Sequence, residues 1–255
     1  MKKLLSNKQY SGILWAIVVA SLFITISLWG RNYFSGTTWY FFSTALRFVF
    51  GFIILLIAKK LYNAPIKNVL SMKGSKMALI AGSGFLLFLL YYIILWCSGI
   101  KSIKGLTPGI LISRIILQQI ATGFYEELNY RFLILEGYFY GSQNIKNKLM
   151  YGFISFLLFG AVHVVDGWST SMFLLTGVIG FAFAVMYLKS RNIVIPMVLH
   201  FIYDVFANLV GYIEWNNSTL FANMNSISDI SFIIMFAASV IMLLKTEKKI
   251  KKMQL

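Results

Sequence analysis

The residues of this chain that could do chemistry are a few ionisable side chains embedded in apolar, helix-length sequence. The chain has two histidines, His163 in FLLFGAVHVV and His200 in PMVLHFIYD, and a third apolar segment carries the adjacent Glu126 and Glu127. An ionisable group in hydrocarbon costs roughly 2.5–3.5 kcal/mol on insertion scales, so such groups usually face an internal cavity and mark function. We therefore predict that these two carboxylates and two imidazoles, from three segments, form one buried site.

The spacing of residues around the two glutamates predicts that they have different roles. Glu127 and Arg131 are four residues apart, so on a helix they can pair along one face. Glu126 is rotated by about 100° from Glu127 and can point elsewhere. The pair would hold one carboxylate ionised and leave Glu126 free to act as a general base. The alternative is a structural ion pair that only locks helix packing.

The two histidines each have a neighbour at helical spacing. Phe159 precedes His163 by four residues, and Asp204 follows His200 by four. Asp204 could therefore orient the His200 ring, fix its tautomer or share its proton. A single histidine in a membrane helix is often a packing or hydrogen-bonding residue, but that explanation must here cover both histidines and an additional aspartate.

The composition indicates a polytopic membrane protein. Of the 255 residues, 59% are hydrophobic and 12% are charged, whereas a soluble domain carries about 25% charged residues. The formal net charge is +15, yet the basic residues cluster at the ends of apolar runs. That pattern is typical of membrane topology and argues against nucleic-acid binding. The one cysteine, Cys97, excludes an internal disulfide.

Eight apolar stretches are near the ~20 residues that a helix needs to cross a bilayer. They are residues 11–30, 38–58, 77–97, 109–138, 149–165, 170–188, 193–213 and 229–244. The first stretch is long and lacks a cleavage site, so we interpret it as a retained anchor and not as a signal peptide. The sequence thus predicts an all-α, multi-pass integral membrane protein with about eight transmembrane helices.

The distribution of basic residues sets the orientation. With the N-terminus in the cytoplasm, 17 of the 23 basic residues lie inside. The three outside are Arg31, Lys101 and Lys104, and the three within spans are Arg47, Arg114 and Arg131. This asymmetry predicts that both termini are cytoplasmic and that the number of crossings is even.

Three motifs, in this order along the chain, resemble the CAAX-protease and bacteriocin-processing family, the Abi family of intramembrane endopeptidases: Glu126-Glu127-x-x-x-Arg131, Phe159-x-x-x-His163 and His200-x-x-x-Asp204. The resemblance covers residues 105–212, which would form the catalytic core. Residues 1–104 would then hold membrane helices 1–3, and residues 213–255 the last membrane helix and a basic cytoplasmic tail. The resemblance also points to a bacterial plasma membrane.

The resemblance implies a role for each motif residue. Glu126 would activate a water molecule, with His163 helping to hold or polarise it. Glu127 and Arg131 would brace the site. His200, together with the residue four positions later, would stabilise the oxyanion that forms when the scissile carbonyl is attacked.

Asp204 departs from the family pattern, because many members have Asn at that position. An ionised Asp cannot donate a hydrogen bond to an oxyanion. Asp204 must therefore be protonated, act through His200 or ligate a metal. Glu126, His163 and His200 would suffice as zinc ligands with a position left for water, although the chain has no H-E-x-x-H motif. A metal-free and a zinc-assisted mechanism both stay open.

The leading hypothesis is an endopeptidase that cleaves a small membrane-associated peptide or protein; the resemblance suggests a peptide leader, a pheromone or a bacteriocin precursor. Its partners would be that substrate and the lipid bilayer, and the sequence does not determine the oligomeric state. A second hypothesis is a non-catalytic scaffold or bacteriocin-immunity protein, against which the retained glutamates and histidines argue. A third is a proton-coupled transporter, for which paired halves with matched broken helices are missing.

Overall fold

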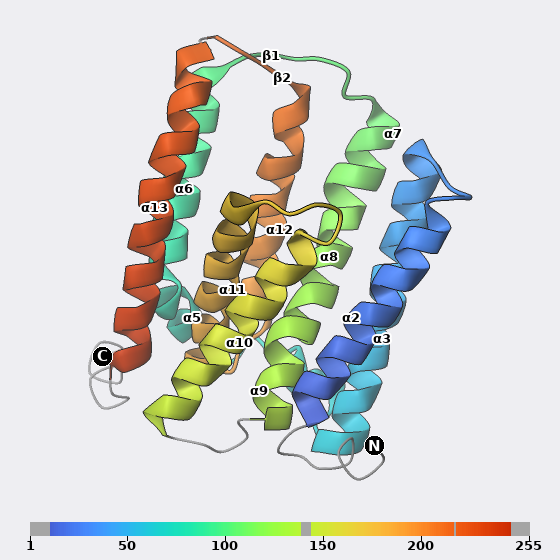
Figure 1. The fold of residues 1–255 in the computed structure, drawn as a ribbon, viewed down its shortest axis with the longest axis vertical. Coiled ribbons are helices and arrows are strands. Elements are labelled where there is room, and N and C mark those ends of the chain that lie inside the picture. Colours follow the sequence, from blue (N-terminus) through green and yellow to red (C-terminus); the bar gives the residue numbers. More distant parts are fainter. Residues whose placement is uncertain (1–10, 139–143, 217, 246–255) are drawn as a thin grey trace.

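The computed structural model describes residues 11–138, 144–216 and 218–245, with side chains described except at positions 138 and 218–229. Nearly all of this part is helical, and the long helices form one bundle (Figure 1). The all-α membrane architecture expected from the sequence is thereby confirmed. Several basic residues used for the orientation lie outside the described residues: Lys2, Lys3, Lys8, Lys248, Lys249, Lys251 and Lys252.

The first two helices form a hairpin beside the segment that carries the glutamates. α2 (Ser11–Gly30) and α3 (Gly36–Tyr62) are joined by a short turn at the top of Figure 1. Asn63 ends α3 in the left-handed conformation, with φ of 51°, which Asn tolerates better than most residues. Ser43 of α3 accepts a hydrogen bond from Gln118 of the neighbouring segment, 3.1 Å between the two atoms.

A bent pair of helices follows the hairpin. After the short α4 (Ile66–Val69), α5 (Ser75–Ala81) and α6 (Ser83–Gly99) meet at an angle of 74°. The bend falls at Gly82, where a Cβ would lie 2.6 Å from the terminal methyl of Met186. A side chain at this position would therefore require the Met186 side chain to move.

Two short strands join distant parts of the chain at the top of Figure 1. β1 (Ile100–Ile103) pairs in antiparallel fashion with β2 (Ile213–Trp215). Ser102 and Lys104 both bond the Glu214 carboxylate. The sequence did not predict this ribbon, because neither strand is long enough to show a period of two.

The segment that carries the glutamates is one long helical rod with two π-helical stretches. It consists of α7 (Pro108–Ile110), η1 (Leu111–Leu117), α8 (Gln118–Glu127), η2 (Leu128–Phe132) and α9 (Leu133–Tyr138). Thr107 caps its start by accepting a hydrogen bond from the Ile110 amide, with Pro108 at the first helical position. π-helical turns occur frequently at functional sites, and η2 begins directly after Glu127.

The remaining helices complete the bundle. They are α10 (Ile145–His163), α11 (Thr170–Ser190), α12 (Val194–Leu209) with the 3₁₀ turn η3 (Val210–Tyr212), and α13 (Ser218–Leu244). Every residue of α11 from Ile179 to Tyr187 is buried. A helix that is apolar on all sides and buried is a central one, so α11 forms the middle of the bundle.

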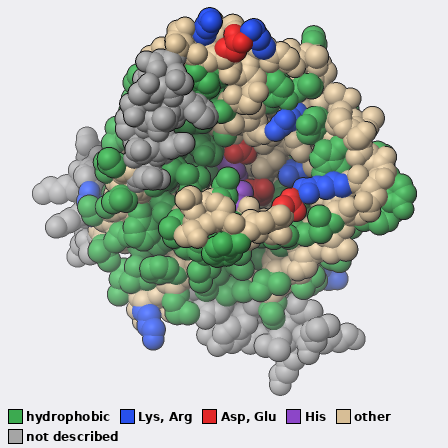
Figure 2. Space-filling view, turned by 45° about the horizontal axis from the view of Figure 1, so that its top comes forward, with side chains coloured by type: hydrophobic (Ala, Val, Ile, Leu, Met, Phe, Trp, Pro, Cys, Tyr) green, Lys and Arg blue, Asp and Glu red, His purple; other side chains and the backbone are tan. Residues whose placement is uncertain are grey.

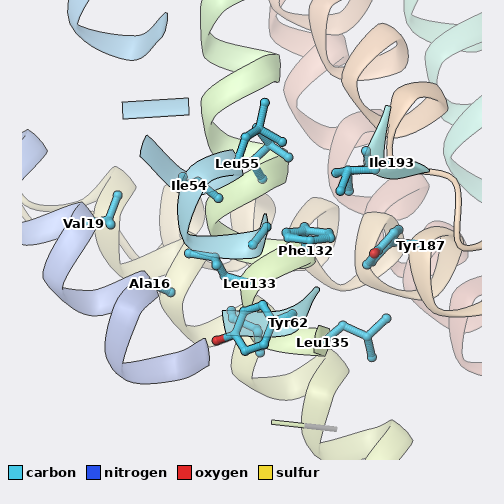
Figure 3. Packing of buried hydrophobic residues seen from close by; sticks show 14 of the residues in the cluster. Ala16, Val19, Ile54, Leu55, Tyr62, Phe132, Leu133, Leu135, Tyr187 and Ile193 are labelled. Carbon is cyan, nitrogen blue, oxygen red and sulfur yellow. The ribbon is translucent and has the colours of Figure 1, made fainter. Parts of the chain in front are cut away.

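The core around the lower half of the glutamate-bearing segment is apolar. Figure 3 shows side chains from four parts of the chain meeting there, among them Val19, Leu55, Leu133 and Tyr187. Val19 comes from α2, Leu55 from α3, Leu133 from α9 and Tyr187 from α11. The N-terminal hairpin and the predicted catalytic core therefore share one packed interior.

The expected count of eight spans is not confirmed. Five single helices are long and apolar enough to cross a membrane, and the bent pair α5–α6 gives a sixth candidate. Within the described residues, Ile230–Leu244 is a shorter apolar helix. The predicted stretch 109–138 is helical, but two π-helical turns divide it.

The closest backbone approach between α2 and α9 provides a test of this packing. A Cβ on Gly12 would lie 2.0 Å from the Leu133 carbonyl oxygen and 2.7 Å from the Gly137 Cα. Gly12→Ala should therefore force the two helices apart and cost about 1–3 kcal/mol of unfolding free energy. Thermal unfolding of purified protein in detergent measures this, with Gly211→Ala as the control because nothing lies within 4 Å of its Cβ position. Equal stability of both variants would contradict the packing described.

Candidate active site

Glu127 and Arg131 form a fully buried ion pair on the glutamate-bearing segment. Arg131 Nε lies 3.3 Å from Glu127 Oε2, and both side chains are 0% exposed. The guanidinium also lies over the ring of Phe159, 4.0 Å from its centroid. A buried charge requires an oppositely charged partner. The Glu127–Arg131 pair therefore lies where the sequence predicted an ion pair that supports the site.

His200 is bonded to the same carboxylate from a different helix. Its Nδ1 donates to Glu127 Oε1 across 2.8 Å, and the histidine is 3% exposed. α12 approaches α8 this closely because Gly123 has no side chain: a Cβ there would lie 2.8 Å from the Met197 carbonyl oxygen. The bond to Glu127 fixes the His200 tautomer and directs its other nitrogen away from Arg131.

The second nitrogen of His200 faces two more carboxylates. His200 Nε2 lies 3.4 Å from Asp204 Oδ2 and 3.7 Å from Glu126 Oε2. Both distances exceed a typical hydrogen bond. Glu126 Oε2 is buried and has no hydrogen-bond partner among the described residues. One imidazole thus stands between Glu127, to which it is hydrogen-bonded, and Glu126, which lies beyond hydrogen-bonding distance.

His163 reaches the same place from the end of α10. Its Nδ1 lies 2.7 Å from the Phe159 carbonyl oxygen. A carbonyl only accepts, so Nδ1 carries the hydrogen and Nε2 of the neutral ring is left as an acceptor. The Phe159 ring contacts both imidazoles, with centroid distances of 4.5 Å to His163 and 5.7 Å to His200. The structure therefore brings together all the residues that the sequence singled out.

A cavity of about 310 Å³ opens beside Glu126 and His163. Tyr125 and Tyr130 line it near Glu126, while Arg31, Trp39 and Asp166 line it near the α2–α3 turn. Arg31 and Asp166 form an ion pair of 3.0 Å across this opening. Figure 2 shows the hollow from that end, with acidic and histidine side chains inside it.

Arg47 of α3 is a cavity residue to which the sequence analysis gave no role. It lines the same cavity as Glu126 and His163, and it interacts electrostatically with Glu126 and Asp204. Its position inside an apolar span was the signal that could have singled it out, because charged residues in spans usually face functional cavities. Only the folded structure shows which cavity it faces.

The expected zinc ligands do not form a metal site in this geometry. In the part of the chain that the structure describes, no group of three or more His, Cys, Asp and Glu side chains could hold a metal ion. Glu126, His163 and His200 lie in one neighbourhood but do not converge on a common point.

Comparison with known families bears on the same segment. Residues 108–206 match a family described as Rce1-like, type II CAAX prenyl endopeptidase. The matched segment contains all seven motif residues from Glu126 to Asp204, which confirms the resemblance inferred from the motifs. It covers less than half of the chain and leaves α2, α3 and α13 outside. A search of curated proteins and a search of solved structures each returned no significant match.

Removal of the Glu127 charge tests the bracing role. Glu127→Gln keeps the shape of the side chain but leaves Arg131 without its carboxylate partner. An unpaired buried charge costs on the order of 3–5 kcal/mol, so this variant should unfold at much lower temperature or denaturant concentration than wild type.

The matched control is Glu214→Gln, which removes an exposed carboxylate. A hydrogen bond from Lys104 lowers the pKa of Glu214, so this carboxylate is ionised at neutral pH. Exposed pairs contribute little to stability, and the control should unfold like wild type. A Glu127→Gln protein as stable as the control would show that Arg131 does not depend on this partner.

Proposed function

Because residues 108–206 are similar to the Rce1-like type II CAAX prenyl endopeptidases, we propose that this protein is an intramembrane endopeptidase in which Glu126 activates the attacking water. The family match supports a protease, and the long apolar helices indicate that this protease is itself a multi-pass membrane protein. The observation that carries the finer proposal is the different state of the two adjacent carboxylates. Glu127 is held by Arg131 and His200, whereas Glu126 keeps an unengaged oxygen beside the cavity.

The reaction needs one water molecule and one base. A water between Glu126 and the Nε2 of His163 gives its proton to Glu126 as its oxygen attacks the scissile carbonyl carbon. The carbonyl oxygen becomes an oxyanion. Collapse of the tetrahedral intermediate breaks the C–N bond, and Glu126 returns the proton to the leaving amine. The products are a carboxylic acid and an amine, with Glu126 regenerated.

The other residues act by holding this arrangement. Glu127 and Arg131 keep His200 in place, and His200 directs Nε2 toward Glu126 and Asp204. Asp204 is half-buried, with a side chain 15% exposed. An ionised Asp204 contributes by its charge on His200 and not as a hydrogen-bond donor.

The substrate class follows from where the cavity lies. The site lies among helices long enough to span a membrane, so the scissile bond must come to the bilayer. A small membrane-associated peptide or the tail of a membrane protein meets this requirement, and a peptide leader, pheromone or bacteriocin precursor would be of this kind. A short, extended segment suits a cavity of about 310 Å³.

The side from which the substrate enters follows from the charge distribution. The cavity opens near Arg31 and Trp39, at the end of the bundle that also carries β1 and β2 (Figure 1). Lys59 and Lys60 lie at the opposite end, in the last turn of α3. Basic residues mark the cytoplasmic side. The substrate therefore approaches from the extracytoplasmic side.

Glu126→Gln tests the catalytic base. Gln has nearly the same shape but cannot accept a proton, and removal of a general base costs roughly 10²–10⁴-fold in rate. Comparing the membrane peptides of cells with wild-type protein and with this variant should reveal a peptide that accumulates uncut. Purified wild type should cleave it in liposomes, with the same rate after chelator treatment, and the folded variant should not. Full activity of Glu126→Gln would rule out this mechanism, and loss of wild-type activity with chelator would require a metal.

Cysteine labelling of intact cells tests the side of entry. In a Cys97→Ala background, Lys101→Cys should react with a membrane-impermeant maleimide, because β1 lies at the cavity end of the bundle. Met72→Cys is the matched control at the opposite end; Met72 is 58% exposed and should react only after the membrane is made permeable. The reverse labelling pattern would place the cavity mouth in the cytoplasm.

A further inference from the structure

Arg47 is the cavity cation that the mechanism above does not use. Its Nη1 donates to the Ser43 carbonyl oxygen at 3.3 Å and to the Ser43 hydroxyl, and its guanidinium lies 5.0 Å from the centroid of the Phe23 ring. Its Nε is buried and lacks a hydrogen-bond partner among the described residues. The ion pairs found in that part of the chain do not include Arg47.

The position of Arg47 is set by the neighbouring helices. Gln118 of α8 donates to the Ser43 hydroxyl, 3.1 Å away, and so joins α3 to the glutamate-bearing segment. Gly51, one helical turn further along α3, allows the close contact: its Cβ would lie 2.3 Å from the ring of Phe124. Arg47 is therefore held beside the cavity wall and does not extend freely into it.

The charges around Glu126 create a need for such a group. Glu126, Glu127 and Asp204 all surround His200, and hydrolysis adds a further negative charge on the substrate oxygen. His200 Nδ1 is already bonded to Glu127, and an ionised Asp204 cannot donate. Preorganised donors and cations at the developing charge are commonly the largest contribution to catalysis in such reactions.

On the basis of the proposed function, we propose that Arg47 is a catalytic residue that binds the oxyanion. Arg47 lines the cavity together with Glu126 and His163, so its guanidinium places a positive charge in the wall of the space that the scissile carbonyl would enter, and its buried Nε has no hydrogen-bond partner among the described residues. As water attacks, the electron pair of the carbonyl moves onto the oxygen, and Arg47 stabilises that charge until the C–N bond breaks. Arg47 stays protonated throughout. It lies in α3, outside the segment matched to the endopeptidase family.

The main experiment measures kcat and KM of Arg47→Gln on the peptide that accumulates uncut in Glu126→Gln cells. Loss of one oxyanion donor typically costs about 10²–10³-fold in kcat, so we expect that loss with little change in KM. Arg47→Lys keeps the charge but not the geometry and should lie between wild type and Arg47→Gln.

Arg114→Gln is the matched control. Arg114 is also a half-buried arginine within the bundle, but it donates to the Tyr212 hydroxyl at 3.1 Å and does not line the cavity. This variant should keep the wild-type kcat. Thermal unfolding of all variants in detergent identifies any that are misfolded. If Arg47→Gln is misfolded, the kcat of Arg47→Lys is compared with that of wild type instead.

A second measurement separates oxyanion binding from other roles. A phosphonamidate analogue of the same peptide places an anionic tetrahedral phosphorus at the scissile bond. Arg47→Gln should weaken the binding of this analogue by about the factor lost in kcat and leave the binding of the peptide to an inactive Glu126→Gln background unchanged. Weaker binding of the peptide itself would instead mean that Arg47 holds a carboxylate of the substrate, and would overturn the proposal.

The substitution Asp204→Asn supplies an independent check, because Asn is a donor. In that background, Arg47→Gln should cost less than in wild type. An inactive Glu126→Gln combined with full kcat in Arg47→Gln overturns the role of Arg47 alone. Full activity in Glu126→Gln overturns the proposed function and the role of Arg47 together.

Discussion

The buried contact of Glu127 with both Arg131 and His200 is the interaction on which the rest of the site depends. An arginine that is 0% exposed in a membrane-spanning bundle is tolerable only with its charge compensated. The carboxylate that compensates it also accepts the hydrogen bond of His200, 2.8 Å away. One acidic group thus satisfies a cation on its own helix and orients an imidazole on another. The network fixes α12 relative to the glutamate-bearing segment, and with it the positions of Asp204 and Glu126.

The apolar surroundings make this network possible by excluding water. The ring of Phe159 contacts Arg131 on one side and approaches both imidazoles. Helices associate closely in a bilayer where small residues let their backbones meet. Gly123 has that function between α8 and α12, and Gly180 has it between α11 and α10, where a Cβ would lie 3.0 Å from Phe159 Cβ and from the Ser155 carbonyl oxygen. A larger residue at Gly123 would separate His200 from Glu127.

The N-terminal hairpin belongs to the site although its sequence lies outside the matched family segment. Residues from α2 and α3 form one wall of the cavity and its opening. The matched segment holds the acids and imidazoles, and the hairpin contributes Arg47 and Arg31. The cavity wall therefore contains carboxylates from the matched segment and cations from the hairpin.

The sequence by itself determined the membrane class, the order of the helices and the seven motif residues, because hydropathy, basic-residue bias and i,i+4 spacing are local properties of the chain. It predicted the Glu127–Arg131 pair for the same reason. The sequence did not reveal that His200 is hydrogen-bonded to Glu127. It also did not reveal that Arg47 of α3 lines the same cavity as Glu126, or that α5 and α6 meet at 74°. These depend on how helices distant in sequence pack, which is decided by glycine contacts and by the need to pair buried charges. The count of eight spans is not confirmed for a related reason: hydropathy measures whether a segment is apolar, whereas bends and π-helical turns arise from its tertiary contacts.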